Sequence, residues 1–390
     1  MADFFSLDSY DYHLPENLIA QQAHNPPDQC KLMTVNKTTW VVEHKIFSDL
    51  QTLLKPQSVL FFNNSKVVKA RIPISHSYPD IKITNPQGKI IQLEGELFYL
   101  SPLDEDYYFL VRPWSKLKTG TKIQIGEFVL YIGENFEHGR KVHIEGKLFD
   151  LLEKYGQMPL PPYVSYAQEK VASYQPIFAK TPGSVASPTA SLHFTKTLLD
   201  SLQSKEICTD FVTLHVWIWT FKSMTSSDIK QHEIHHETCE IDIELFSRIM
   251  NYKLNQQAIV AVGTTSCRTL ESLPYLWLKL KDELNSFCGE KTSAYWNNLS
   301  SHLDPSKSYI SNAHISMEEG KIHFDCSLYI LPGFVFSVID QLITNFHLPK
   351  SSLMVLVASI MGYELMMQCY EDAIKNHYAF YSFGDAMRIY

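Results

Sequence analysis

The amino-acid sequence predicts an α/β protein: a body built on a mixed sheet, with a small antiparallel β-barrel domain inserted into it. From residue 165 onward, segments with helical spacing alternate with apolar, strand-like segments, a pattern typical of an α/β domain. Between residues 71 and 153, short alternating runs recur between turn signals such as NPQGK and KTGTK, which favours a small antiparallel sheet or barrel. A chain of 390 residues also fits two domains of roughly 100–200 residues each.

The change from short strand-like runs to alternating helical and strand-like segments predicts the domain borders. We expect the α/β body to comprise residues 1–70 and 154–390, and the inserted barrel domain residues 71–153. The segment MPLPPYV at residues 158–164 is a proline-stiffened exit from the insert. Residues 284–321 contain Ser, Asn and Lys with weak periodicity, so we predict a surface insertion there.

The elements of the body follow from hydrophobic periodicity. Residues 42–55 have helical spacing, and residues 58–64 (SVLFFNN) form an apolar run that ends in polar residues. Such a run is typical of a buried strand that precedes a functional loop. Further helices are expected at residues 194–205, 242–255, 268–284 and 351–362, and further strands at 211–219, 257–263 and 327–333.

Composition limits the classes of function. The net charge is −8, so a nucleic-acid partner would need a local basic patch. The seven cysteines form no CxxC pair, which argues against a disulfide framework or a thiolate zinc site and favours a reducing cytoplasm. The N-terminus shows no signal-peptide pattern. The sequence contains no run of about 18 apolar residues, the length that a membrane-spanning helix needs, so we predict no membrane span.

Three histidine-bearing segments are candidates for chemistry. Residues 183–195 (GSVASPTASLHFT) form a predicted loop before a helix, whose backbone amides suit a carboxylate or phosphate; the alternative is a capped loop with nothing bound. His215 lies within a predicted strand, where a histidine is more often a satisfied core group. The segment HEIHHE contains His232, His235 and Glu237, which form either an acid–base or metal cluster or a solvated polar face.

A strand-to-helix junction is the strongest single candidate. Residues 262–272 (VGTTSCRTLES) place Thr264, Thr265, Ser266 and Arg268 where α/β proteins bind ligands. Arginine is scarce in this chain, and its guanidinium binds an anion through two hydrogen bonds. The alternative is a hydroxyl-capped helix on which Arg268 pairs with Glu271 at i, i+3. Near the C-terminus, TNFHLPK contains Asn345 and His347, and SFGDAM contains Asp385.

These segments, in this order, resemble the S-adenosylmethionine:tRNA ribosyltransferase-isomerase family of queuosine biosynthesis. The segments YDYHLPENLIAQ, FFNNSKVVKAR, VRPWSKLKTG and MPLPPYV fit the same family in register, so the resemblance extends from about Tyr10 to Ile389. The resemblance implies an α/β body with an inserted barrel. It also implies an enzyme that transfers the ribosyl group of S-adenosylmethionine, isomerised, onto 7-aminomethyl-7-deazaguanine in tRNA. The products are epoxyqueuosine, adenine and methionine.

This reaction assigns roles to the candidate residues. It needs a base beside the sulfonium and an acid for the departing adenine, but no metal or other cofactor. The methionine carboxylate needs an anion site, for which Arg268 or a helix N-terminus is suitable. We expect Thr264, Thr265, Ser266, Arg268, His193, His215 and Asn345 to converge on one cavity. The implied catalytic residues are His193, His215, His232, His235 and Glu237; the substrate-binding residues are Ser187, Thr189, Thr264, Thr265, Ser266, Arg268, Asn345, His347 and Asp385; and the tRNA-binding residues are Lys66, Lys69, Lys116 and Lys118. The partners are S-adenosylmethionine and tRNA, and we expect a cytoplasmic monomer.

The chain departs from the family pattern at several positions. Family members usually have arginine at the positions of Pro27 and Lys31, and N-D-T-R where this chain has residues 63–66 (NNSK). They usually have glycine at the positions of Trp114, Ser191, Trp217 and Trp219. An alternative function is therefore a divergent paralogue that binds a nucleoside or RNA without this catalysis. Indole rings of residues 217–219 that fill the cavity would favour this alternative.

Overall fold

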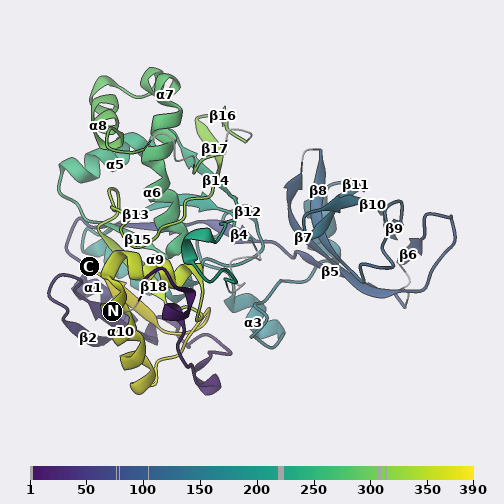
Figure 1. The fold of residues 1–390 in the computed structure, drawn as a ribbon, viewed down its shortest axis with the longest axis horizontal. Coiled ribbons are helices and arrows are strands. Elements are labelled where there is room, and N and C mark those ends of the chain that lie inside the picture. The colour runs from purple at the N-terminus through teal and green to yellow at the C-terminus, as the bar shows by residue number, and fades with distance from the viewer. Residues whose placement is uncertain are drawn as a thin grey trace. The chain divides into compact units, whose positions relative to one another are not determined.

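The chain forms two compact units in a computed structural model, which describes residues 3–75, 77–78, 80–103, 105–217, 224–304, 309–311 and 314–390. The first unit comprises Met1–Ser65, Pro161–Thr181 and Ser187–Tyr390, and the second comprises Lys66–Leu160 and Pro182–Ala186 (Figure 1). The second unit extends past both ends of residues 71–153, the range expected for the insert. The predicted α/β class with an antiparallel barrel-like sheet is confirmed.

A ten-stranded mixed sheet forms the centre of the first unit. Its middle strands β13, β3, β15 and β18 are parallel to one another. All five residues of β3 are buried, as expected for a parallel strand that is covered on both faces. The strand order is β16 (Ser316–Glu318), β17 (Lys321–Cys326), β14 (Glu237–Asp242), β13 (Cys208–Leu214), β3 (Val59–Asn63), β15 (Ile259–Val262), β18 (Gln341–Asn345), β19 (Ala386–Ile389), β1 (Lys31–Val35) and β2 (Val42–Ile46).

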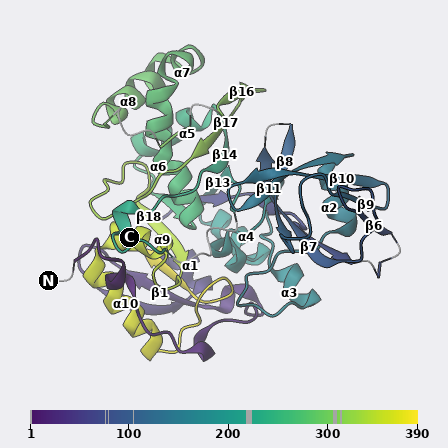
Figure 2. The same cartoon turned by 45° about the vertical axis from the view of Figure 1, so that its right-hand side comes forward.

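Helices cover this sheet and bury its apolar residues. Leu198 and Leu202 of α4 lie in one core cluster with Leu60, Phe62 and Val262, which share a face because alternate strand residues point the same way. Figures 1 and 2 show α7 and α8 together at one end of the unit, beside α5 and α6. The helices of this unit are α1 (Leu50–Leu53), α3 (Gln168–Ser173), α4 (Lys196–Ser204), α5 (Leu245–Leu254), α6 (Thr264–Lys279), α7 (Lys281–Phe287), α8 (Glu290–Ser300), α9 (Ser352–Met361) and α10 (Tyr363–Lys375).

The second unit is a seven-stranded antiparallel, barrel-like sheet followed by one helix. Buried and exposed residues alternate along strands such as β9, as the sequence pattern predicts for a sheet with one covered face. The order is β5 (Arg71–Ser75), β7 (Glu94–Leu103), β8 (Asp106–Arg112), β11 (Gly139–Glu145), β10 (Phe128–Phe136), β9 (Lys122–Ile125) and β6 (Ile81–Thr84), with α2 (Leu148–Tyr155). Strands β4 (Ser65–Val67) and β12 (Thr181–Ser184) pair separately.

Most predicted elements of the body are confirmed, and two are wrong. The strand predicted at residues 211–219 ends at Leu214, and residues 218–219 lie outside the described residues. Residues 42–46, predicted as helix, form β2 because they pair with β1; tertiary pairing here overrides the local spacing. Residues 327–333, predicted as a strand, are irregular, although Leu328 and Ile330 are buried. The sequence also gives no prediction for strands β1, β14, β16, β17, β18 and β19 or for helices α3, α8 and α10. Among the described residues, no single helix is long and apolar enough to cross a membrane; α9 and α10 meet those criteria only as a pair bent by 114°.

The segment 284–321, expected to be a surface insertion, contributes to the core. Trp296 of α8 is fully buried, and its indole N–H donates to the carbonyl oxygen of Phe246 at 2.8 Å. Its ring lies 4.9 Å from the ring of Phe246 and 6.1 Å from that of Trp277. Because α8 supplies this indole, the part of the segment that forms α8 belongs to the folded body.

We expect Trp296→Ala to lower the free energy of unfolding by about 3–5 kcal/mol, the usual cost of removing a buried aromatic side chain. Urea denaturation of the whole chain measures this value. Phe287→Ala is the control, because Phe287 of α7 is 65% exposed, and its removal should change stability by no more than about 0.5 kcal/mol. Equal effects of the two substitutions would contradict a core role for α8.

Candidate active site

The carboxyl ends of four parallel strands meet at one edge of the ten-stranded sheet. Ser65 follows β3, His215 follows β13, Gly263 follows β15, and Asn345 ends β18. In open α/β sheets, ligands bind at this edge. The edge therefore collects polar side chains from segments that are far apart in the sequence.

A cavity of about 60 Å³ lies at this edge. Its volume suits a small polar group, such as a carboxylate, better than a whole nucleoside. The polar residues that line it come from four parts of the chain: the start of η5 (Thr189–His193) and the residues before it, the β15–α6 junction, the end of β18 and the residues after it, and the loops that contain Tyr163 and Ser382. These residues are Ser187, Thr189, Thr264, Thr265, Thr344, Asn345, His347, Ser351, Tyr163, Tyr381 and Ser382.

The N-terminus of α6 is the most distinctive part of this cavity. Gly263, at φ 89°, turns the chain from β15 into α6, and no side chain caps the helix. The first N–H groups of a helix have no intrahelical partner and carry the positive end of its dipole. The hydroxyls of Thr265 and Ser187 are buried without a hydrogen-bond partner in the described part of the chain. Uncapped amides and two unpaired hydroxyls together form an anion-binding surface.

A chain of hydrogen bonds connects this cavity to the buried side of the sheet. The Thr189 hydroxyl donates to Asn345 Oδ1 at 2.9 Å, and Asn345 Nδ2 contacts His193 Nε2 at 3.0 Å. His193 Nδ1 lies 3.3 Å from the sulfur of Cys30, and burial lowers the pKa of His193 to about 4. His193 is thus a neutral imidazole that orients Asn345, while Asn345 itself lines the cavity.

His215 forms a second polar pair at the same edge. Its Nδ1 lies 2.9 Å from the hydroxyl of Ser65, and burial lowers the pKa of the imidazole to about 4. The side chain of Asn63 holds both strand ends in place, because its Oδ1 accepts from the N–H groups of Ser65 and Leu214. Ser65 is not among the predicted site residues; its two signals in the sequence are the polar end of an apolar run and its place in the NNSK segment, where the family usually has N-D-T-R.

Arg268 does not line the cavity and is ion-paired, although its Nη2 is buried without a partner among the described residues. Its guanidinium donates to the carboxylate of Glu237 and to the carbonyl oxygen of Leu328, and both charged side chains are at most 10% exposed. Glu271 does not pair with Arg268; it accepts from the backbone N–H groups of residues 337–339. The helical Arg268–Glu271 pair is therefore wrong, and Arg268 does not line the cavity on which it was expected to converge.

The remaining predicted site residues divide between the cavity and structural positions. His347 lines the cavity; its Nε2 contacts the Thr344 hydroxyl at 2.8 Å, and burial lowers its pKa to about 3. The Ser266 hydroxyl donates to the carbonyl oxygen of Val262. Asp385 accepts from the backbone N–H groups of Lys31 and Ala379 at 2.7 Å each, so it fixes the start of β1.

The histidines of the HEIHHE segment do not form the helical pair considered from the sequence. His232 and His235 lie in irregular chain between η7 (Ile229–Gln231) and β14, and neither lines the cavity. The His232 ring lies against that of Tyr329, with centroids 5.8 Å apart. Within the described ranges, no group of three His, Cys, Asp or Glu side chains is arranged to hold a metal ion.

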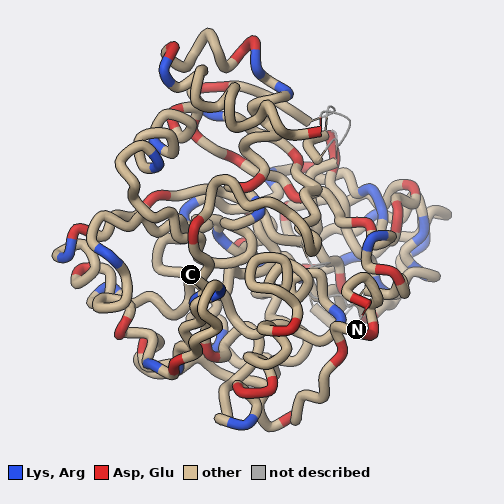
Figure 3. Tube along the Cα trace, turned by 60° about the vertical axis from the view of Figure 1, so that its left-hand side comes forward, with Lys and Arg blue, Asp and Glu red and all other residues tan. Residues whose placement is uncertain are grey.

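The lysines assigned to tRNA belong to the second unit. Lys66, Lys116 and Lys118 are exposed, whereas the amine of Lys69 is bound to the carboxylate of Glu153 at 2.6 Å. Basic and acidic residues are interspersed along the trace in Figure 3. Lys66, Lys116 and Lys118 thus offer accessible positive charges to a polyanion.

The tryptophans that replace glycine do not close the cavity as far as the structure describes them. Trp217 is 7% exposed and is not a lining residue, whereas its neighbour Val216 is. Trp219 lies outside the described residues. The guanidinium of Arg140 lies over the ring of Trp114, 4.2 Å from its centroid, within the second unit.

Comparison with known proteins gives matches along nearly the whole chain. Residues 7–389 match the protein family described as "queuosine biosynthesis protein". The chain is 34% identical over 389 residues to the S-adenosylmethionine:tRNA ribosyltransferase-isomerase of Sulfurihydrogenibium sp., with 98% of this chain and 99% of that protein covered. It is 36% identical over 394 residues to the protein of the same name from Thermosynechococcus vestitus, with 99% and 96% covered. The chain is also similar to S-adenosylmethionine tRNA ribosyltransferase from Thermotoga maritima, whose crystal structure is known. The two are 27% identical in sequence, the match covers 98% of this chain and 100% of that one, and the TM-score is 0.49.

The buried neutral histidines predict a pH dependence of stability. Because their pKa values are lowered in the folded state, the unfolded chain binds more protons below its ordinary histidine pKa of about 6.5. The free energy of unfolding should be fully retained above pH 6.5 and should fall as the pH drops from 6.5 to 4. Each buried histidine contributes up to about 3 kcal/mol to this fall in the free energy of unfolding.

Urea denaturation at a series of pH values measures this slope for the wild type and for His193→Gln. The variant should show a smaller fall between pH 6.5 and 4, because one buried imidazole is gone. His13→Gln, at an exposed position, should keep the wild-type slope. A His193→Gln slope identical to that of the wild type would rule out the buried neutral imidazole.

Proposed function

The chain belongs to the family of queuosine biosynthesis proteins, and we propose that it transfers and isomerises the ribosyl group of S-adenosylmethionine onto 7-aminomethyl-7-deazaguanine in tRNA. The products are epoxyqueuosine, adenine and methionine. The chain is an enzyme, a ribosyltransferase-isomerase with S-adenosylmethionine and tRNA as its substrates. The observation that carries this function is the similarity to enzymes of this name over both units rather than over one. The same similarity favours catalysis over a non-catalytic paralogue.

The N-terminus of α6 supports a place for the methionine carboxylate. Of the two anion ligands suggested by the sequence, Arg268 is neutralised by Glu237. The uncapped start of α6 instead offers unpaired amides and the hydroxyls of Thr265 and Ser187. A carboxylate there would satisfy these buried groups, which otherwise cost free energy.

Proton transfer falls to His215 in this proposal. Burial keeps its imidazole neutral at pH 7, so the ring can accept a proton. If the Ser65 hydroxyl accepts the Nδ1 proton at 2.9 Å, Nε2 is left unprotonated and able to act as the base. His193 orients Asn345 and does not exchange protons with substrate. The proposed reaction involves no metal and no redox cofactor.

We expect the purified protein to release adenine from S-adenosylmethionine when it is given tRNA that carries 7-aminomethyl-7-deazaguanine. Chromatography of the free base measures this release. Thr265→Val should raise the KM for S-adenosylmethionine about twofold to tenfold, because it removes one hydrogen bond worth about 0.5–1.5 kcal/mol. The methyl group that replaces the hydroxyl keeps the shape of the side chain.

Thr52→Val is the matched control, since the Thr52 hydroxyl donates to the carbonyl oxygen of Asp49 on an exposed helix. It should leave the KM unchanged. Absence of adenine release from the folded wild type would contradict the proposed function. Release with an unchanged KM in Thr265→Val would contradict only the carboxylate site.

We also expect the second unit to bind tRNA phosphates through its exposed lysines. Reversing Lys66, Lys116 and Lys118 to glutamate should weaken tRNA binding and make it less sensitive to salt, because each phosphate contact releases counterions. Filter binding at several salt concentrations measures both effects. Lys196→Glu, at an exposed position of α4, is the control, and equal losses in the two proteins would place the tRNA elsewhere.

A further inference from the structure

The ten-stranded sheet opens between two of its strands. Strand β13 pairs with β3 through Cys208–Val212, but it pairs with β14 only at Thr213 and Leu214. Strand β14 continues beside β17 as far as Asp242. Residues 210–212 and 241–242 therefore face each other without ladder hydrogen bonds, and a gap separates the two strands.

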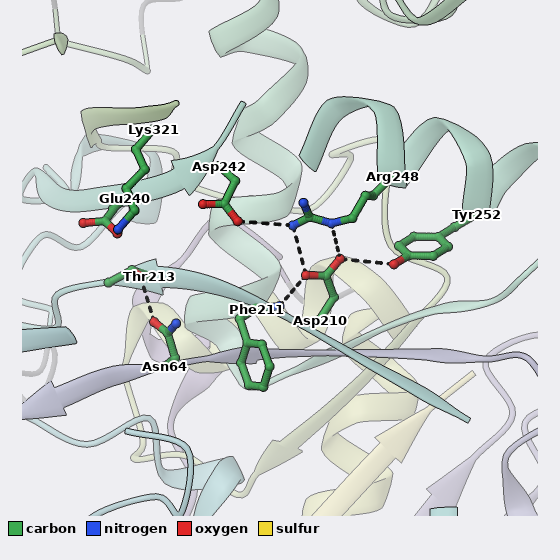
Figure 4. A network of polar contacts seen from close by, with 9 residues as sticks. All are labelled: Asn64, Asp210, Phe211, Thr213, Glu240, Asp242, Arg248, Tyr252 and Lys321. Atoms are coloured by element: carbon green, nitrogen blue, oxygen red, sulfur yellow. Dashed lines mark hydrogen bonds and ion pairs between the residues drawn. The ribbon is translucent and has the colours of Figure 1, made fainter. Parts of the chain in front are cut away.

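A polar network lies beside this gap, and Figure 4 shows its contacts. Arg248 of α5 donates two hydrogen bonds to the Asp210 carboxylate, at 2.8 and 3.1 Å, and lies 3.6 Å from Asp242. The Tyr252 hydroxyl donates to the same Asp210 carboxylate at 3.2 Å. The backbone N–H of Phe211, which a paired strand would satisfy, donates to Asp210 Oδ1 at 2.8 Å. The side chain of Asp210 thus takes the place of the missing ladder.

A second chain segment covers the other side of the gap. The backbone N–H groups of Lys180 and Thr181 both donate to the carbonyl oxygen of Asn64. The Asn64 side chain accepts from the Thr213 hydroxyl at 2.7 Å, so its Nδ2 remains a donor without a partner among the described residues. These contacts enclose a cavity of about 280 Å³.

The walls of this cavity differ in chemistry. Phe178 and Phe211 form one wall, with ring centroids 5.8 Å apart, and Phe211 is 36% exposed. Glu240 and Asp242 form the opposite wall. Glu240 is bound by Lys321 at 2.5 Å, but Oδ1 of Asp242 has no partner in the described part of the chain, and its side chain is 56% exposed.

These walls match the chemistry of a nucleobase that carries an amine. RNA-binding proteins recognise an unstacked base by stacking it on aromatic rings and by hydrogen bonds to its edges. A carboxylate accepts from a cationic amine or from the N–H groups of a guanine-type base, and the Asn64 amide can donate to its carbonyl oxygen. Asp210, Glu240 and Asp242 outnumber Lys180 and Lys321 in the lining, so the cavity does not favour an anion such as a phosphate.

We propose that this second cavity binds the acceptor base, a 7-deazaguanine with a primary amine turned out of the RNA, between the phenylalanine wall and Asp242. The inference rests on the proposed function. Its position supports it: Thr213 lines the second cavity and Val216 lines the first, and His215 lies between them on the same chain segment. The two cavities are thus lined by residues just before and just after His215 in the chain.

Binding of two synthetic RNA hairpins to the full-length protein tests the proposal. One carries 7-aminomethyl-7-deazaguanine in its loop and the other carries guanine at that position. Asp242→Asn should weaken binding of the amine-bearing hairpin about tenfold, the effect of losing a hydrogen bond to a charged group, and leave the guanine hairpin unchanged. Phe211→Ala should weaken both hairpins about fivefold or more, because it removes a stacking surface.

Asp200→Asn is the matched control, because Asp200 is also an ion-paired carboxylate, with a side chain 59% exposed; it should bind both hairpins as the wild type does. Equal affinities of Asp242→Asn and wild type for the amine-bearing hairpin, or equal losses for both hairpins, would overturn the proposal. Adenine release by the wild type separates the two inferences. Release together with an unaffected Asp242→Asn refutes the second cavity alone, whereas hairpin discrimination without release refutes the proposed function alone.

Discussion

The parallel alignment of β13, β3, β15 and β18 is the constraint on which the rest of the structure depends. Parallel neighbours place all their carboxyl ends at one edge, so four separate stretches of sequence deliver polar residues to one place. The alignment also requires β3 to be buried along its whole length, which its apolar sequence allows. The same strands then determine where α6 begins and which way its N-terminal amides point.

Most charged groups near this edge stabilise the fold and are not available to a ligand. Glu237 pairs with Arg268, Glu271 binds three backbone amides, and Asp385 fixes the start of β1. Buried charges of this kind are tolerated only when they are paired or hydrogen-bonded. Because Arg268 is ion-paired with Glu237 and does not line the cavity, the helix terminus with its unpaired hydroxyls is the part of the cavity that suits an anion.

The first cavity lies at the carboxyl ends of the parallel strands and the second lies between β13 and β14, and the two form in different ways. At the first, a helix begins directly after a strand and leaves its amides unpaired. At the second, the sheet itself opens, and Asp210 with Arg248 replaces the missing backbone pairing. The first arrangement suits an anion, such as the carboxylate of the proposed donor. The second suits a planar base with a positive group, such as the proposed acceptor.

The sequence by itself determined the α/β class, the β-rich insert, and helices and strands such as β3, β15, α4, α5 and α9, because their hydrophobic periodicity is local. The order of motifs also identified the family. Tertiary structure alone decided that residues 42–46 are a strand, that Trp296 belongs to the core, and that Arg268 pairs with Glu237. Each of these depends on a partner distant in the chain, and spacing along a sequence carries no information about which buried charge meets which. The Ser65–His215 pair and the opening beside Asp210 were hidden for the same reason, since they exist only where separate strands end or diverge.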